Sequence, residues 1–113
     1  MKNISIINGY HAHIYYDQDT IETAKALAQE AKDTHGVEIG RFHEKPVGPH
    51  PVWSCQLTVS TSQFAGLLPW LSLNRKGLTM FVHPETDDAY LDHTEHAIWL
   101  GKQQSLNLDI FKK

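Results

Sequence analysis

The order in which apolar patterns follow one another constrains the fold of this chain more than any other feature of its sequence. Apolar and polar residues alternate in the extended segments, and apolar residues recur at three- and four-residue intervals in two helical segments. In chain order these are strand 4–16, helix 21–35, strands 37–42 and 52–59, a helix that includes 64–71, strand 78–82 and a short strand 97–100. The order strand, helix, strand, strand, helix, strand belongs to the split βαβ unit. The sequence therefore predicts an α+β fold, a ferredoxin-like split βαβ sandwich whose antiparallel sheet carries two helices on one face.

Both helices have recognisable start signals. Asp19, followed three residues later by Glu22, resembles a capping box and predicts the start of the first helix. Thr61 or Ser62 is the predicted cap of the second helix. Pro69 falls inside the second helical pattern and is expected to kink or split it.

In this topology the first strand lies at the centre of the sheet, beside the third and fourth strands. Ala12 and Ile14 should then face the helices, whereas His11, His13 and Tyr15 should point to the other face. The topology leaves that second face open, and an open sheet face must meet water, a ligand or another subunit. We therefore expect a homodimer that forms a cleft there.

Size and composition exclude several classes of protein. The 113 residues predict one domain, 1–113. The formal charge is −3 and no Lys/Arg run is dense enough to follow a phosphate backbone, so a nucleic-acid partner is not expected. No apolar stretch approaches the roughly 20 residues of a membrane span, and the first residues lack the apolar region of a signal peptide, which predicts a cytoplasmic protein with no membrane partner. Cys55 is the single cysteine and is expected to be a plain buried thiol.

The chain contains eight histidines, several of which are gathered in short motifs. His11 and His13 stand two residues apart on a predicted strand, so both imidazoles share a face with Cβ atoms about 6.5–7 Å apart. Such a pair can converge on one metal ion. Two exposed polar residues on a half-solvated strand remain an alternative interpretation.

The motif Gly48-Pro49-His50-Pro51 holds a histidine between two prolines in the loop before the third strand. The prolines restrict the backbone on both sides, and this stiffness suits a ligand held in a preset geometry. The loop enters the third strand where the first strand finishes, so His50 is expected to approach His11 and His13. A rigid connector with an incidental histidine is the alternative.

A third group follows the fourth strand, where His83-Pro84 precedes Asp92-His93-Thr94-Glu95-His96. His83 is expected to reach the same sheet face, and Asp92 could orient a neighbouring imidazole. The second motif could equally be a solvated turn. His35 is expected to end the first helix without a site role, and Arg41 could bind a substrate carboxylate or form a surface ion pair.

Imidazole excess without a thiolate cluster favours iron, zinc, copper or nickel as the metal. The sequence contains no phosphate-binding glycine loop, no Gly-x-Ser-x-Gly motif and no two-cysteine zinc motif. A metal-centred function is therefore the leading interpretation of the residues themselves.

Four blocks of residues together resemble the DOPA 4,5-dioxygenase family, in particular its small bacterial-type members. The blocks are Tyr10-His11-Ala12-His13-Ile14-Tyr15-Tyr16, Gly48-Pro49-His50-Pro51, His83-Pro84-Glu85-Thr86 and Asp92-His93-Thr94-Glu95-His96-Ala97-Ile98-Trp99-Leu100-Gly101. They occur in the family's order, and the resemblance as a whole spans roughly residues 8–110. The resemblance implies a small ferredoxin-like subunit, associated as a dimer, that uses non-haem Fe(II) and molecular oxygen to open a catechol ring beside a hydroxyl.

Carried over by motif, the resemblance implies His11, His13 and His50 as metal ligands and His83 and His93 as catalytic residues. The division of these five histidines into ligands and acid/base groups stays open, and Zn is the alternative to Fe(II).

The leading hypothesis is a metal-dependent extradiol ring-cleaving dioxygenase that acts with molecular oxygen on a catechol, DOPA-like or a related aromatic. Its apolar slot for the ring could be lined by Tyr15, Tyr16, Trp53 or Phe81. One alternative is a non-catalytic metal- or small-molecule-binding dimeric domain. Another is a stable dimer module whose histidines are structural.

Overall fold

The computed structural model describes residues 6–112, so residues 4–5 of the predicted first strand lie outside the described part of the chain. The elements, in chain order, are β1 (Tyr10–Tyr16), α1 (Ile21–His35), β2 (Glu38–Ile39), β3 (Trp53–Val59), α2 (Thr61–Asn74), β4 (Met80–Pro84), α3 (Ala89–Asp92), β5 (Ile98–Leu100) and a 3₁₀ turn, η1 (Leu108–Phe111).

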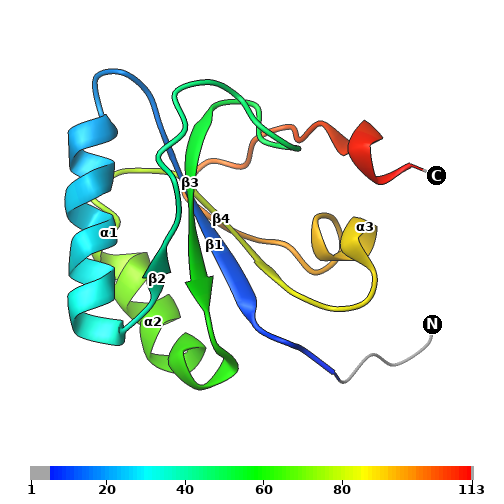
Figure 1. The fold of residues 1–113 in the computed structure, drawn as a ribbon, viewed down its shortest axis with the longest axis horizontal. Helices are drawn as coiled ribbons and strands as arrows, with labels where there is room; N and C mark the ends of the chain where they lie inside the picture. The colour runs from blue at the N-terminus through cyan, green and yellow to red at the C-terminus, as the bar shows by residue number, and fades with distance from the viewer. Residues whose placement is uncertain (1–5, 113) are drawn as a thin grey trace.

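The strands form one antiparallel sheet in the order β2-β3-β1-β4-β5. β1 is central, between β3 and β4, as the sequence predicts. Helices α1 and α2 cover the same face of the sheet (Figure 1). This arrangement confirms the predicted α+β, ferredoxin-like architecture, with β5 added at the edge beside β4.

The apolar core lies between the sheet and the two long helices. Ile14 of β1 and Leu57 of β3 are fully buried there, together with Leu27 of α1 and Leu67 of α2. Each such side chain contributes about 1.5–3 kcal/mol relative to an exposed position. Cys55 is a free thiol in the same core, as predicted.

The second face of the sheet is covered, which differs from the open face expected from the topology. His13 and Tyr15 are only 5% and 4% exposed, and His83 is 1% exposed. The segment before β3, α3 and the C-terminal segment lie on this side of the sheet, opposite α1 and α2 (Figure 1). A hydrogen bond from Asn107 N to Pro49 O, 2.8 Å long, joins the C-terminal segment to the proline-rich loop.

The predicted cap of the first helix is wrong. Thr20 is the N-cap residue of α1 and its side chain makes no capping hydrogen bond. The carboxylate of Asp17 instead accepts hydrogen bonds from the backbone N–H groups of Asp19 and Thr20. Asp17 is favoured because a short acidic side chain readily bonds the backbone two residues further on.

The N-cap of the second helix lies one residue before Thr61, the first of the two predicted caps. Ser60 is the N-cap: it accepts from Gln63 N, and the Gln63 side chain accepts from Ser60 N. This reciprocal pair is a capping box, and it is more favourable than a single bond from Thr61 or Ser62. The helix is continuous across Pro69, so the proline does not split it.

β2 is two residues long, shorter than the predicted strand 37–42. Just after β2 the chain approaches β3 so closely that a Cβ at Gly40 would lie 2.9 Å from the carbonyl oxygen of Gln56, which favours glycine there. The chain nevertheless stays against β3 beyond β2: Gly40 N donates to Gln56 O at 2.8 Å, and His43 N donates to Ser54 O at 3.1 Å.

No helix within residues 6–112 has both the length and the apolar character needed to cross a membrane.

Candidate metal centre

Strand register brings three histidines together on the covered face of the sheet. His11 of β1 lies directly opposite His83 of β4, and His13 lies two residues further along β1 on the same face. One ring nitrogen from each of the three lies within 4.8 Å of the corresponding nitrogens of the other two. His11, His13 and His83 therefore form a compact triad, and this group could hold a metal ion.

The closest approach in the triad fits two ligands of one ion. The Nε2 atoms of His13 and His83 are 3.2 Å apart. Two nitrogens bound at about 2.1 Å would be separated by about 3.0 Å in an octahedral arrangement and about 3.4 Å in a tetrahedral one. The observed separation lies between these two values.

The hydrogen bond made by His83 leaves its Nε2 free of a proton, because His83 donates Nδ1–H to the carbonyl oxygen of Pro84 at 2.9 Å. His11 Nδ1 lies 2.7 Å from the carboxylate of Glu85, within ion-pair distance. A neutral imidazole that donates from Nδ1 presents a lone pair on Nε2, which is the usual arrangement of a metal-bound histidine with its outer partner.

Burial keeps these imidazoles neutral. Burial lowers the pKa of His83 to about 4, and it lowers the pKa of His13 well below its usual value, helped by the neighbouring His50. The pKa of His11 is lowered in the same direction by burial and by the nearby His93. Neutral imidazoles need no deprotonation before they bind a metal, so the donor set fits a divalent transition metal.

His50 comes close to His13, as the predicted topology requires. Their ring centroids are 4.2 Å apart. His50 Nδ1 lies 2.8 Å from the hydroxyl of Tyr15, in a buried pair. Burial lowers the pKa of His50 to about 4 and raises that of Tyr15, so both groups are neutral near pH 7.

His93 lies on the outer side of the same group of histidines. Its ring centroid is 4.1 Å from that of His83 and 4.4 Å from that of Phe111 in η1. Its Nδ1–H donates to Ala89 O at 2.7 Å, which leaves a lone pair on Nε2. All five histidines named from the sequence as ligands or catalytic residues thus belong to one cluster.

Asp92 does not orient His93. It is buried, and its carboxylate accepts hydrogen bonds from Thr86 and from Nδ1–H of His96. Burial alone would raise the pKa of Asp92, but these hydrogen bonds outweigh it and hold the pKa below its usual value. Asp92 therefore ties the chain after β4 to α3.

The remaining histidines lie at other positions. His35 ends α1, as predicted, and its ring packs against Trp70 of α2. His43 lines a small pocket beside His13 and His50. From the sequence, Glu85 was included only in the motif His83-Pro84-Glu85-Thr86 and was given no role, although its position two residues after His83 was the available signal.

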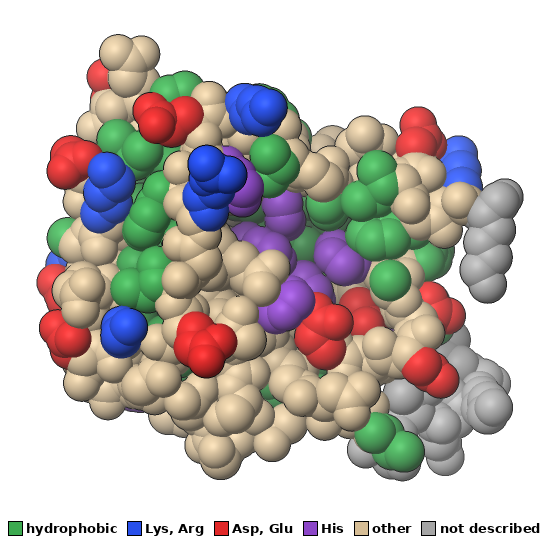
Figure 2. Space-filling view, in the orientation of Figure 1, with side chains coloured by type: hydrophobic (Ala, Val, Ile, Leu, Met, Phe, Trp, Pro, Cys, Tyr) green, Lys and Arg blue, Asp and Glu red, His purple; other side chains and the backbone are tan. Residues whose placement is uncertain are grey.

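Several hollows adjoin the cluster or its neighbours, among them one of about 470 Å³ lined by His93. A pocket of about 160 Å³ is lined by His13, His50 and Arg41, and a second of about 390 Å³ is lined by His11 and Glu85. Figure 2 shows the histidine side chains in a recess, with basic side chains near one end of the group and acidic side chains near the other.

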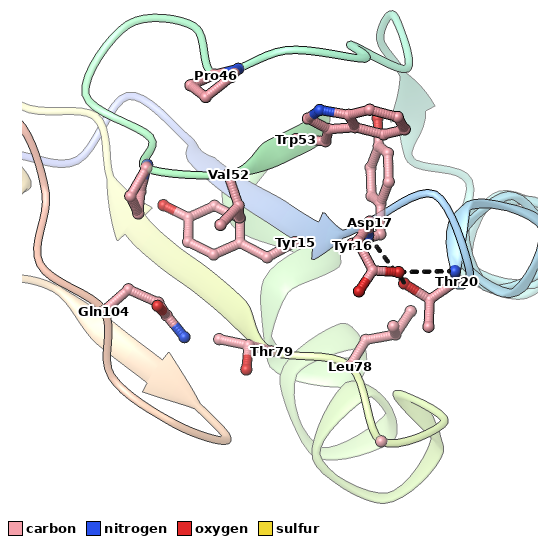
Figure 3. Close-up of a pocket in the computed structure, with 12 residues that line it drawn as sticks. Tyr15, Tyr16, Asp17, Thr20, Pro46, Val52, Trp53, Leu78, Thr79 and Gln104 are labelled. Atoms are coloured by element: carbon pink, nitrogen blue, oxygen red, sulfur yellow. Dashed lines mark hydrogen bonds between the residues drawn. The ribbon is translucent and has the colours of Figure 1, made fainter.

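A further hollow lies at the end of β1 and measures about 510 Å³ (Figure 3). Tyr15, Tyr16 and Trp53, three of the four aromatic residues predicted to line a slot, are in its wall. The fourth, Phe81, is fully buried and packs between His13 and Trp99. Tyr15 joins this hollow to the cluster through its contact with His50.

Comparison with known proteins identifies relatives. The model of the Dopa 4,5-dioxygenase family matches residues 10–110. A DOPA 4,5-dioxygenase from Amanita muscaria is 33% identical over 113 residues, covering 92% of this chain and 50% of the relative. An uncharacterised 21.2 kDa protein from Botryotinia fuckeliana is 37% identical over 121 residues, covering 96% of this chain and 66% of the relative. The chain thus spans between half and two thirds of the length of these two proteins.

A crystal structure of a candidate dioxygenase from Nostoc punctiforme is similar over nearly its whole length. Its TM-score is 0.88 at 41% identity, and the match covers 91% of this chain and 90% of the other. The family match covers most of the chain and includes every histidine of the cluster. The chain belongs to the DOPA 4,5-dioxygenase family.

Proposed function

We propose that this protein is a metal-dependent extradiol dioxygenase that opens the ring of a catechol with molecular oxygen. The observation that carries the proposal is the buried histidine cluster, in which three neutral imidazoles offer nitrogens within 4.8 Å of one another. In the reaction the carbon–carbon bond beside one hydroxyl is cleaved and both oxygen atoms enter the product. No external reductant is needed.

We assign His11, His13 and His83 as the ligands, because their nitrogens are the three that converge. His50, predicted as a ligand from the sequence, is left outside this set, because its nitrogens do not belong to the group of three that converge. Bound Fe(II), our preferred metal, would supply Lewis acidity toward the catechol hydroxyls and redox chemistry with oxygen. Zn would supply the first of these alone.

Two flanking histidines are available to move protons. His93 has a lone pair on Nε2, so it can accept the proton of a catechol hydroxyl at the edge of the cluster. On the other side of His13, the hydrogen-bonded pair of His50 and Tyr15 can relay a proton between its two members. Burial of His13 and His83 excludes bulk water from the centre of the cluster.

Oxygen uptake tests the proposal. The protein is loaded anaerobically with Fe(II), then mixed with DOPA, caffeate, protocatechuate and 4-methylcatechol in oxygenated buffer. We expect one oxygen molecule consumed per catechol, a yellow ring-opened product, and two labelled oxygen atoms in that product when ¹⁸O₂ is used. His13→Ala should abolish the reaction, whereas His35→Gln, a histidine on the helical side of the molecule, should leave it intact.

Other outcomes favour the alternative functions. Stoichiometric metal binding without turnover of any catechol would support a non-catalytic metal-binding domain and overturn the enzyme proposal. Equal metal binding by the wild type and His13→Ala would overturn the proposed ligand set.

A further inference from the structure

Arg41 shares a small pocket with the histidine cluster. The pocket of about 160 Å³ is lined by His13 and His50, by Arg41 and His43, and by the polar side chains of Ser54 and Gln56. It therefore opens onto the same histidines that the proposed reaction uses.

The backbone on both sides of Arg41 is anchored to β3. Gly40 N donates to Gln56 O at 2.8 Å, and His43 N donates to Ser54 O at 3.1 Å. Arg41 thus stands on a segment whose position is set by the sheet, although its own side chain is exposed. The backbone that carries this charged group is therefore held beside the pocket.

The charge of Arg41 is not balanced by the protein in the described structure. Within residues 6–112 no carboxylate forms an ion pair with Arg41, and no Asp or Glu lines this pocket. Every Asp and Glu of the chain lies in those residues. By contrast, Glu38 and Glu85 line the pocket that contains His11. The two ends of the cluster therefore differ in charge, as Figure 2 shows.

We propose that Arg41 is a specificity-determining residue that binds a carboxylate on the side chain of the substrate. Guanidinium pairs with carboxylate in a bidentate geometry that a point charge does not reproduce. The inference rests on the proposed function for the position of the catechol ring beside His13 and His50.

The same pocket provides no acidic partner for an ammonium group. The preferred substrate class is therefore a catechol carboxylic acid in which an α-amino group adds nothing to binding. DOPA should bind no more tightly than its deaminated analogue, 3-(3,4-dihydroxyphenyl)propanoate. Dopamine and neutral 4-ethylcatechol should bind more weakly than either acid.

Anaerobic calorimetry tests this inference without turnover. The protein as purified is titrated with 3-(3,4-dihydroxyphenyl)propanoate, DOPA and 4-ethylcatechol. The wild type should bind the deaminated acid about tenfold or more tightly than 4-ethylcatechol, from the strength of a charged hydrogen-bonded pair. Arg41→Gln should remove that difference and leave the affinity for 4-ethylcatechol unchanged. Lys45→Gln removes the same charge from the same loop, outside the pocket, and should preserve wild-type selectivity.

The outcomes separate this inference from the enzyme proposal. If Arg41→Gln loses acid binding and the wild type turns over no catechol, the role of Arg41 is supported and only the proposed function is overturned. Turnover of catechols with unchanged selectivity in Arg41→Gln would overturn the role of Arg41 alone. The inference would be overturned if the wild type bound the acid and the neutral catechol equally well, or did not bind the acid at all. It would also be overturned if DOPA bound more than tenfold more tightly than its deaminated analogue. In steady-state kinetics Arg41→Gln should raise KM for the acids and leave kcat unchanged.

Discussion

At the scale of single residues, Glu85 is the group that most directly controls the proposed metal site without belonging to the triad. Its carboxylate lies 2.7 Å from His11 Nδ1 and 3.9 Å from His83 Nδ1. Burial raises the pKa of Glu85, helped by the negative charge of Asp92. A carboxylate in this position fixes the orientation of the imidazole and increases its basicity.

Replacement of Glu85 should weaken metal binding and preserve the fold. Glu85→Gln keeps the shape of the side chain but replaces a charged acceptor with a weaker one, so metal affinity should fall about tenfold. Competition titration with a chelating dye measures this, and circular dichroism reports the fold. Glu22→Gln, on the surface of α1, is the matched control. Unchanged affinity in Glu85→Gln would show that the carboxylate does not support the site.

Cys55 gives the stability of the protein a defined dependence on alkaline pH. Burial raises the pKa of this thiol from 9.0 to about 12. Above pH 9 the unfolded chain loses the thiol proton while the folded chain retains it, so the free energy of unfolding falls as pH rises. The loss from this group is about 1.4 kcal/mol per pH unit up to the folded pKa, or about 2 kcal/mol between pH 9 and pH 10.5.

Urea unfolding at several pH values between 8 and 10.5 measures the slope. Cys55→Ala should be less stable than the wild type at pH 8 because of the cavity, and its stability should decline less steeply with pH. The remaining slope reports Tyr15 and Tyr16, whose pKa values burial also raises. Parallel curves for the two proteins would contradict the assignment to Cys55.

At the scale of elements, the start of α2 is stabilised by a capping box formed by two residues. Ser60 and Gln63 satisfy each other's backbone N–H groups. The Gln63 side chain also donates to Gly36 O at 3.0 Å, so the same residue links α2 to the end of α1. The capping box therefore stabilises the start of α2 and fixes its position against α1.

Loss of the cap should destabilise the protein by a measurable amount. Ser60→Ala removes the acceptor for Gln63 N and should lower the free energy of unfolding by about 1 kcal/mol. Thr61→Ala, a substitution at the neighbouring exposed position, should change it by less than about 0.5 kcal/mol. Chemical denaturation of the two variants tests the difference, and equal effects would contradict the assigned cap.

At the scale of the whole molecule, the sheet separates two layers of different chemistry. The layer under α1 and α2 is apolar, whereas the opposite layer contains the histidines under α3, η1 and the proline-rich loop. The histidine layer joins segments far apart in the chain, since His13 meets His83 and Asn107 bonds to Pro49. An ion bound there should therefore stabilise the entire fold.

Metal binding should raise global stability in proportion to affinity. At a free metal concentration one hundred times the Kd, the gain is about 2.7 kcal/mol, provided the unfolded chain does not bind the ion. Thermal unfolding with and without Fe(II), under nitrogen, measures it, and a chelator should reverse the shift in Tm. His83→Ala should lose the stabilisation and His35→Gln should retain it. An equal shift in both variants would place the ion outside the triad.

The sequence by itself determined the architecture and the face on which the chemistry lies. Alternation along β1 sends Ile14 to the core and His13 to the opposite face, because successive side chains of a strand point in opposite directions. This pattern is local, so it can be seen without the structure. The same holds for the end of α1 at Gly36, where the backbone has a φ of 76° that favours glycine.

The tertiary structure alone decided which side chains meet. His50 and His83 both lie beside His13, and His50 also pairs with Tyr15, because strand register and loop path set distances that no local pattern encodes. The covering of the second sheet face likewise follows from the packing of α3 and the C-terminal segment, which are distant from β1 in sequence.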